Sequence, residues 1–388
     1  MERLRYLTAG ESHGRGLVGI LEGIPANVPI SRDNLNHHLA RRQKGYGRGG
    51  RQLIEKDEAD VLSGIRFGKT MGSPIAMVVW NRDWDNWTER MDVWQRPEDV
   101  REVTVPRPGH ADLSGALKYR QTDIRNILER ASARETAIRV ALGTIARQFL
   151  EHLGIVIGSH VIQIHEAKSE FDATQAEDLN AMNEQADTSE VRCLDSDAEK
   201  HMISQIKEAM LTKNTCGGVF EIIVRGLPVG LGSHVHWERK LDARIAQAMM
   251  SIQAMKGVGI GLGFEAGARW GSECHDAIYY EKERGFYRKS SGSGGTEGGM
   301  STGEPLIVRV AMKPISTLME PLDSADLITK EPTAAHIERS DACAVPAASV
   351  IGEAVLALTL ADAVLEKFGG DSLEEIRAYM KWNRENTL

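Results

Sequence analysis

Ser132-Ala133-Arg134-Glu135, followed by an apolar residue at every third or fourth position as far as Leu153, is the stretch that decides the fold. A serine followed three residues later by a glutamate has the spacing of a helix-capping box. The apolar residues recur at the spacing that places them on one face of a helix, and Gly154 ends the pattern. These apolar positions are Ile138, Leu142, Ile145, Phe149 and Leu153. The stretch therefore predicts a long helix with one buried face.

Further helices are expected after this one. Apolar periodicity predicts helices at about 238–254 and 347–368, and the second of these should end at Gly369-Gly370. A shorter helix is expected at 197–210, and a capping-box spacing from Ser372 to Glu375 predicts a last helix.

Short runs rich in β-branched residues predict strands between the helices, at 75–80, 155–164, 219–224 and 306–312. Helices and strands together indicate a mixed α and β fold. No low-complexity linker divides the chain, so a single domain over residues 1–388 is expected. The polar and acidic segment at about 165–213 is interpreted as a peripheral excursion rather than a part of the active site.

The composition is that of an ordinary globular protein, with 388 residues, 41% hydrophobic and 26% charged. The four cysteines lie far apart without a C-x-x-C spacing, so neither a metal site nor a disulfide framework is expected. The N-terminus lacks the apolar core of a signal peptide, and the most apolar late stretch, 347–365, contains Glu353 and Asp362. These features predict a cytoplasmic protein without a membrane span.

The formal net charge is −8, from 47 basic and 55 acidic residues, which disfavours a nucleic-acid partner and leaves only local patches to attract anions. One such patch is Arg41-Arg42-Gln43-Lys44-Gly45-Tyr46-Gly47-Arg48-Gly49-Gly50-Arg51, and no acid lies between Asp33 and Glu55 to neutralise it. Arginine suits phosphate and carboxylate, and glycine lets backbone N–H groups approach an anion. A solvated basic surface loop explains the same residues equally well.

The glycines of this patch match the dinucleotide fingerprint G-x-G-x-x-G, at Gly45, Gly47 and Gly50. That motif must follow a buried strand and open a helix. Here it follows residues 37–42, which are typical of a helix end, so a dinucleotide-binding fold is not favoured.

Two histidines lie in turns with charged neighbours. They are His13, in Gly10-Glu11-Ser12-His13-Gly14, and His110, in Pro106-Arg107-Pro108-Gly109-His110-Ala111-Asp112. An imidazole in such a setting can exchange a proton near neutral pH. Taken singly, each is better explained by an ordinary surface or packing role.

Three further segments offer groups that suit a phosphate. Arg130-Ala131-Ser132 precedes the best helix, where free N–H groups favour an anion, although simple capping by Ser132 also explains it. Residues 313–317 offer a lysine and two hydroxyls after a strand, and Arg339-Ser340-Asp341 precedes a long helix. Asp341 is either a base, an orienter of another group, or a cap.

Together these segments resemble the chorismate synthase family. The resemblance runs in order along most of the chain, through Gly10–Gly14, Arg41–Arg51, Pro106–Asp112, Glu129–Glu135, Lys240–Arg244, Gly261–Gly267, Glu297–Met300, Met312–Ile315 and Glu338–Asp341.

The resemblance implies a lyase that converts 5-enolpyruvylshikimate 3-phosphate to chorismate by 1,4-elimination of phosphate. This is the final common step of the shikimate pathway, and it requires reduced FMN. The resemblance also implies an α+β fold with central helices between two antiparallel sheets, and a homotetramer. NADPH as the reductant of the flavin, acting through this chain or through an external flavin reductase, stays open.

The resemblance assigns roles to individual residues. His13, His110 and Asp341 are expected to be catalytic: His13 as the acid for the leaving phosphate, His110 beside the reduced flavin, and Asp341 as a proton acceptor. Substrate anions are expected at Arg42, Arg48, Arg51 and Arg107, and Arg42 and Arg48 are alternatively NADP contacts. FMN contacts are expected at Arg130, Ala131, Ser132, Gln253, Ala254, Gly298, Lys313, Pro314, Ile315, Ser316, Thr317 and Arg339.

Two other function classes stay open at this point. An FMN-dependent oxidoreductase that consumes NADPH shares the basic and glycine-rich segments. A phosphate- or RNA-binding module is less favoured, because the basic patch is short and offers only Tyr46 to stack on a base.

Overall fold

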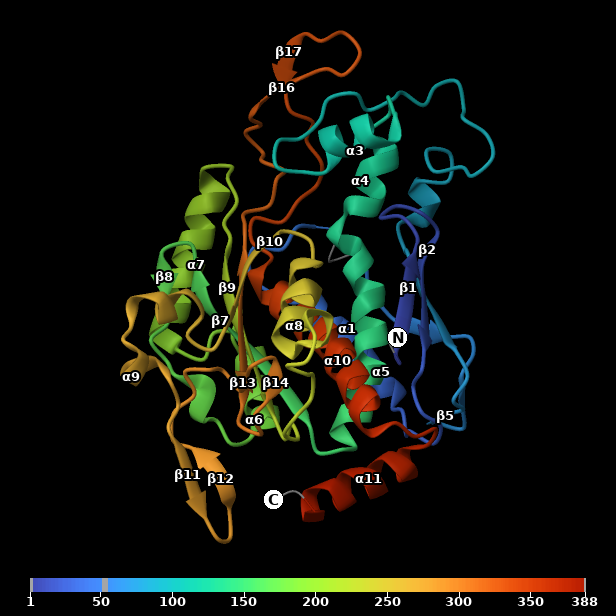
Figure 1. The fold of residues 1–388 in the computed structure, drawn as a ribbon. Coiled ribbons are helices and arrows are strands. Elements are labelled where there is room, and N and C mark those ends of the chain that lie inside the picture. The colour runs from blue at the N-terminus through green and yellow to red at the C-terminus, as the bar shows by residue number, and fades with distance from the viewer. Residues whose placement is uncertain (1–2, 51–54, 387–388) are drawn as a thin grey trace.

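Two antiparallel sheets enclose a layer of helices in the computed structural model, which describes residues 3–50 and 55–386 (Figure 1). The first sheet has the strand order β1-β2-β6-β3. Its strands are β1 (Arg5–Ala9), β2 (Gly16–Glu22), β6 (Ile75–Trp80) and β3 (Ala59–Val61). The second sheet has the order β10-β15-β9-β7-β8. Its strands are β10 (Met255–Ile260), β15 (Leu306–Met312), β9 (Gly218–Arg225), β7 (Val156–Ile164) and β8 (Ala167–Lys168).

The layer between the sheets is built on two long helices, α5 (Thr136–Glu151) and α10 (Val345–Phe368). Helix α5 packs on β2 and β6 of the first sheet, and α10 packs on β7 and β9 of the second. The α+β class and the central position of the helices are therefore confirmed.

Two other helices pack on these long ones: α1 (Arg32–Gln43) on both α5 and α10, and α8 (Leu241–Met250) on α10. The other helices of the described residues are α3 (Asp112–Tyr119), α4 (Arg125–Ala131), α6 (Leu179–Thr188), α7 (Ser196–Leu211), α9 (Gly271–Cys274) and α11 (Leu373–Asn386). Within the same residues, four two-stranded ribbons complete the strands: β4 (Ile65–Arg66) with β5 (Lys69–Thr70), β11 (Ile278–Glu281) with β12 (Gly285–Arg288), β13 (Thr296–Glu297) with β14 (Met300–Ser301), and β16 (Asp323–Ala325) with β17 (Pro332–Ala334).

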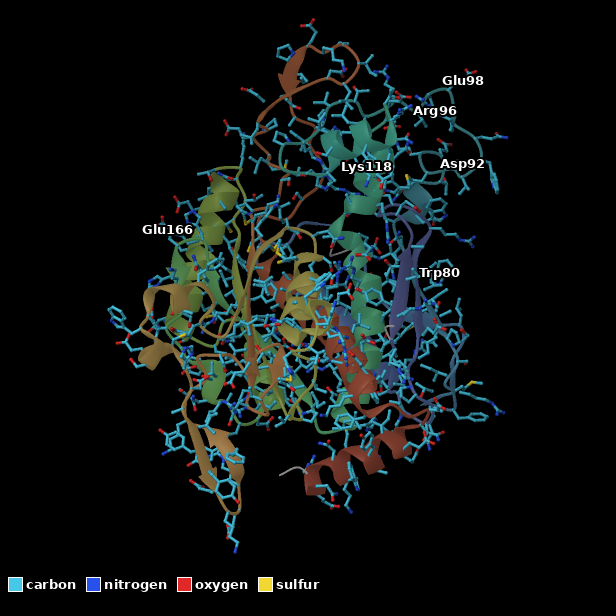
Figure 2. All side chains as sticks on the ribbon, viewed as in Figure 1. Trp80, Asp92, Arg96, Glu98, Lys118 and Glu166 are labelled. Atoms are coloured by element: carbon cyan, nitrogen blue, oxygen red, sulfur yellow. The ribbon has the colours of Figure 1, made fainter. Side chains whose placement is uncertain are left out.

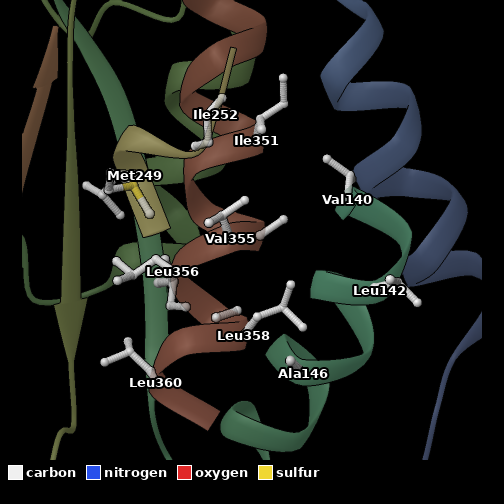
Figure 3. Close-up of a cluster of buried hydrophobic side chains, with 14 of the residues drawn as sticks. Val140, Leu142, Ala146, Met249, Ile252, Ile351, Val355, Leu356, Leu358 and Leu360 are labelled. Atoms are coloured by element: carbon white, nitrogen blue, oxygen red, sulfur yellow. The ribbon is translucent and has the colours of Figure 1, made fainter. Parts of the chain in front are cut away.

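The core forms where α5, α8 and α10 meet (Figure 3). Its labelled side chains are Val140, Leu142, Ala146, Met249, Ile252, Ile351, Val355, Leu356, Leu358 and Leu360. Helices α5 and α10 approach each other so closely that a Cβ added to Gly143 would lie 2.4 Å from the carbonyl oxygen of Ala354. Glycine is therefore required at this crossing.

Helix α10 is the only helix among the described residues that is long and apolar enough to cross a membrane by length and composition. However, 94% of its most apolar window is buried inside the protein. A buried core helix has the same composition, and α10 occupies that position here.

The predicted helix after Ser132 is confirmed, but it begins differently. Ser132 accepts a hydrogen bond from the backbone N–H of Arg134 and caps a short 3-10 turn, Ala133–Glu135, which leads into α5. The carboxylate of Glu135 contacts Thr8 and Arg139 and does not close a capping box. The predicted helix at 238–254 is also shorter, because α8 spans only Leu241–Met250. Ala254 has a positive φ of 68°, which lies outside the helical region.

The segment at 165–213 is joined to the core by charge. Asn183, Asp187 and Arg192 reach a buried ionic cluster, in which Glu353 of α10 accepts hydrogen bonds from Arg41 at 2.7 Å and from Arg147 at 2.6 Å. Burial alone would raise the pKa of Glu353, but these guanidinium groups hold it well below its ordinary value. None of residues 165–213 lines the cavity described below.

Candidate active site

A cavity of about 420 Å³ gathers chain segments that are distant in sequence. Its volume lies in the range of about 300–1,000 Å³ typical of small-molecule sites. The long loop after β6 illustrates how these segments arrive. Asp92, Arg96 and Glu98 lie at the periphery in Figure 2, and the end of the same loop brings Arg107 and His110 into the cavity wall. The other lining segments include Ser12-His13, the loop after α1, the turn before α5, residues 252–255 after α8, residues after β15, and the segment before α10.

Positive charge predominates on the cavity wall. Among the described residues, the cationic side chains in the lining are Arg42, Arg48, Arg107, Arg134, Lys313 and Arg339, and the carboxylates are Glu55, Glu338 and Asp341. Cations in a partly enclosed site favour a ligand that carries several anionic groups.

His13 is held by Glu129 of α4. The backbone N–H of His13 donates to Oε2 of Glu129 at 2.7 Å, and Nδ1 of the ring lies 2.9 Å from Oε1. The ring of Trp87 stacks on the imidazole, with 3.8 Å between centroids and 23° between planes. The position and the plane of the imidazole are therefore both fixed.

Glu129 itself is ionised and surrounded by donors. Burial alone would raise its pKa, but the hydrogen bonds from His13 and the charge of Arg125 hold the pKa below its ordinary value. Nδ1 of His13 is then the nitrogen that donates to this carboxylate, which leaves Nε2 on the side of the ring away from Glu129.

His110 forms a second pair with a carboxylate. Its Nδ1 lies 2.5 Å from Oδ1 of Asp112, the first residue of α3, which is fully buried. Asp112 also accepts from Nε of Arg107 at 2.8 Å. Burial alone would raise the pKa of Asp112, but the contacts with His110 and Arg107 lower it well below the ordinary range. Both cavity histidines are thus oriented through Nδ1 by a carboxylate.

The loop of residues 106–111, which contains His110, packs against residues 313–317 after β15. Arg107 donates through Nη1 to Oγ1 of Thr317 at 3.0 Å, and Ser316 donates to the carbonyl of Gly109 at 2.9 Å. Nζ of Lys313 lies 2.9 Å from Oγ of Ser316. Burial and the nearby charge of Lys256 lower the pKa of Lys313. A lysine and hydroxyls therefore lie beside the His110 loop.

Asp341 contacts the glycine-rich loop after α1. Its Oδ1 accepts from the backbone N–H of Gly49 at 2.6 Å, and its Oδ2 pairs with Nη1 of Arg48 at 2.9 Å. A Cβ at Gly49 would lie 2.9 Å from the carbonyl oxygen of Ser340, so this approach needs glycine. Within residues 3–50 and 55–386, Nε of Arg48 is buried without a hydrogen-bond partner.

Arg42 is buried and already bonded to protein atoms. Its Nε donates to Oγ1 of Thr136, and its Nη2 donates to the carbonyl of Ala133, both at 3.0 Å. Asp57 pairs with Arg42 at 3.4 Å and with Arg134 at 2.6 Å. Burial lowers the pKa of Arg42 to about 10. Arg42 therefore supplies positive charge from within the wall.

Known proteins are similar to this chain in sequence and in fold over nearly its whole length. A family model described as chorismate synthase matches residues 4–365. The chain belongs to the chorismate synthase family.

Individual members of the family agree over nearly the whole chain. Chorismate synthase of Aquifex aeolicus is 56% identical over 380 residues, covering 96% of each chain, and that of Bacillus pumilus is 53% identical over 388 residues, covering 98% of this chain and 99% of the relative. A solved structure described as chorismate synthase superposes with a TM-score of 0.79 at 46% identity, covering 97% of this chain and 96% of the other. The chain is accordingly an enzyme of the lyase class.

Most residues expected from the resemblance to chorismate synthase meet in the one cavity. Those that line it are His13, Arg42, Arg48, Arg107, His110, Ala131, Ser132, Gln253, Ala254, Lys313, Ile315, Ser316, Thr317, Arg339 and Asp341. Pro314 lies between two lining residues, and Arg51 lies outside the described residues. Their roles in a chorismate synthase stay predictions.

Besides Pro314, two expected FMN contacts of the chorismate synthase family do not line the cavity within this chain. Arg130 points to β1, where it donates to the carbonyl of Thr8 at 2.8 Å and to that of Gly10 at 3.1 Å. Gly298 lies in the turn between β13 and β14, next to Gly299, whose carbonyl accepts from the N–H of Leu241 at the start of α8. Gln253, which lines the cavity, follows the other end of α8. Because α8 is about 15 Å long, Gly298 lies about one helix length away from Gln253.

The interpretation of Arg41–Arg51 as one basic loop is partly wrong. Arg41 and Arg42 form the last turn of α1, and Arg41 faces the buried ionic cluster around Glu353 rather than the cavity. Acids outside the stretch pair with its arginines: Asp57, from just after it, contacts Arg42, and Asp341, from far along the chain, contacts Arg48.

Sequence reasoning assigned no role to several residues of this chorismate synthase site, namely Glu55, Asp57, Trp87, Asp112, Glu129, Arg134 and Glu338. Asp112 and Glu129 both lie inside motifs that carry the resemblance. Asp112 is only two residues from His110, so the sequence already showed that these two residues are close. Trp87 and Asp57 carry no such signal, because only the fold brings them to the site.

Proposed function

We propose that this chain converts 5-enolpyruvylshikimate 3-phosphate to chorismate by 1,4-elimination of phosphate, with reduced FMN as the required cofactor. This reaction is the final common step of the shikimate pathway to the aromatic amino acids. The observation that carries the proposal is one cavity in which His13, His110 and Asp341 lie among cationic side chains. The substrate brings a phosphate and two carboxylates, which the excess of cations offsets.

The cavity residues fit a flavin mononucleotide. Ala344, Ala347, Ala348 and Ile351 give an apolar wall against which a ring can lie. Lys313 and Ser316 suit a phosphate, and Oε1 of Gln253 is a buried acceptor without a hydrogen-bond partner among the described residues. Reduced FMN, when bound, supplies an electron-rich ring that takes up the hydrogen leaving the substrate.

His13 is proposed as the acid for the leaving phosphate. Its Nδ1 is directed at Glu129, so the exchangeable proton is on Nε2. Trp87 covers one face of the ring, which keeps water away from that side. A phosphate that leaves as a polyanion is stabilised by proton donation.

His110 is proposed to stabilise negative charge on the reduced flavin. Asp112 accepts from Nδ1 and fixes the orientation of the ring. Asp341 is proposed as a proton acceptor, oriented by Gly49 and Arg48 on its two oxygens.

The arginines are proposed to hold the substrate's anions. Arg48 has a buried Nε that lacks a partner among the described residues, and Arg107 presents its side chain at the cavity wall. Arg42 supports them from behind. The alternative that Arg42 and Arg48 contact NADP remains a proposal for the same groups.

An anaerobic assay with photoreduced FMN and the enolpyruvyl substrate, without NADPH, tests the function. Chorismate and phosphate should form in equal amounts, and reduced FMN should be recovered. If product forms only with equal consumption of NADPH, the chain is an oxidoreductase and the proposal is wrong.

Three further expectations accompany the proposal. NADPH reduces the flavin through this chain or through an external reductase, which an assay with NADPH and oxidised FMN distinguishes. A homotetramer is expected from the family, and sedimentation velocity measures it. A cytoplasmic location is expected, and cell fractionation checks it.

A further inference from the structure

We infer that Glu129 is a positioning residue, which fixes the tautomer and the direction of His13. The inference rests on the proposed function, because it takes His13 as the acid of the reaction. Glu129 does not line the cavity, so it acts through the histidine rather than on a ligand.

Glu129 holds the His13 turn at three points. Its main-chain carbonyl accepts from the N–H of Ser12 at 3.0 Å. Its Oε2 accepts from the N–H of His13 at 2.7 Å, and its Oε1 lies 2.9 Å from Nδ1 of the ring. If Glu129 only capped the backbone of this turn, its contact with Nδ1 of the His13 ring would not be needed. Backbone and imidazole are thus fixed by the same carboxylate.

The carboxylate is in turn fixed by a chain of charges. Nη1 of Arg125 donates to Oε1 of Glu129 at 3.2 Å, and Nη2 of Arg125 pairs with Glu338 at 2.9 Å. Glu338 also contacts His336 at 2.8 Å. These contacts connect α4 to the segment before α10, so Glu129 has little freedom to rotate away from His13.

An ionised carboxylate at Nδ1 fixes the tautomer of the ring. Only an Nδ1–H donor is compatible with it, so the neutral imidazole presents Nε2 as the other nitrogen. Glutamine at this position would still accept from the backbone N–H of His13, but its amide would face Nδ1 and favour the opposite tautomer.

The test is a double-mutant cycle with Glu129→Gln, His13→Ala and the combined variant, assayed with reduced FMN supplied anaerobically. Glu129→Gln should lower kcat by about 10²-fold with a much smaller change in KM. In the His13→Ala background, Glu129→Gln should change kcat by less than about 2-fold.

Glu221→Gln is a matched control. Glu221 is buried and contacts Nε2 of His160 at 3.2 Å, but neither residue lines the cavity. Its kcat should equal that of the unsubstituted enzyme at temperatures where both are folded by circular dichroism.

The outcomes separate the inference from the function it rests on. A folded Glu129→Gln enzyme with an unchanged kcat, alongside an inactive His13→Ala enzyme, overturns the role of Glu129 alone. Equal losses from Glu129→Gln with and without His13 also overturn it, because the glutamate would then act independently. Full activity of His13→Ala would instead refute the proposed acid.

Discussion

Arg48 and Asp341 form an ion pair of 2.9 Å at the cavity wall, although they lie near opposite ends of the chain. The pair ties the loop after α1 to the segment before α10. Nη1 of Arg48 is engaged by Asp341, whereas its Nε is buried without a hydrogen-bond partner among the described residues.

Arg48→Ala should weaken substrate binding by about 10-fold or more, since a charged hydrogen bond in a partly desolvated site contributes about 1.5–3 kcal/mol. FMN binding should change less. Titration of each ligand measures both affinities. Arg66→Ala, which removes an exposed arginine outside the cavity lining, is the control and should alter neither. Unchanged substrate affinity in Arg48→Ala would exclude the anion-binding role.

His13→Ala and His110→Ala should each lower kcat by about 10²–10⁴-fold, as expected when a positioned acid is removed. Both variants should fold and bind FMN, because neither ring fills the apolar core. Anaerobic turnover and FMN titration are the measurements. Wild-type turnover in both variants between about pH 6 and pH 8 would mean that other groups move the protons.

Asp341→Asn should reduce turnover by at least about 10-fold while the protein stays folded. The amide can still accept from Gly49, but it removes the negative charge beside Arg48 and the proton-accepting oxygen. Stopped-flow measurement of product formation checks this. A variant that turns over normally would limit Asp341 to a structural role.

Glu338 should make stability depend on acid pH. Burial alone would raise its pKa, but His336 and Arg125 lower it from 4.5 to about 2. A depressed pKa means that its stabilisation is complete above about 4.5 and is lost as the pH falls toward about 2. Urea unfolding of the wild type and Glu338→Gln between about pH 6 and pH 3 measures it. The difference between the two proteins should shrink as the pH falls, and a constant difference would contradict the assignment.

Gly143→Ala should destabilise the protein by about 1–3 kcal/mol, because the added methyl group overlaps Ala354 where α5 crosses α10. Gly267→Ala is the matched control, since a Cβ there meets nothing within 4 Å. Thermal unfolding of both variants compares them. Equal stability would show that the helices can separate without cost.

Local patterns in the sequence were sufficient for much of the fold. The predicted strands at 75–80 and 306–312 coincide with β6 and β15. Both were recognisable because a run of β-branched and other apolar residues is a signal contained in the strand's own sequence. Strands β1 and β2 and helices α3, α4 and α6 were not predicted. Their sequences carry weaker periodicity, and tertiary packing decides their structure.

The candidate site was also predictable only where its residues lie in recognisable local sequence patterns. His13 and His110 were identified from their turns, and both line the cavity. Their partners differ in how far they lie along the chain: Asp112 is two residues from His110, whereas Glu129 reaches His13 only through the fold. The burial of Arg41 could not be inferred, because its carboxylate partner Glu353 lies on α10.

The wall that α10 contributes to the cavity consists of small and apolar side chains, with Ala344, Ala347 and Ala348 at its start. Charged groups come from other segments. A larger residue at one of these alanines would narrow the cavity while the charged side chains on its wall stay the same. Size selectivity and charge selectivity are therefore encoded on separate parts of the chain, and an engineer or an inhibitor designer can address them independently.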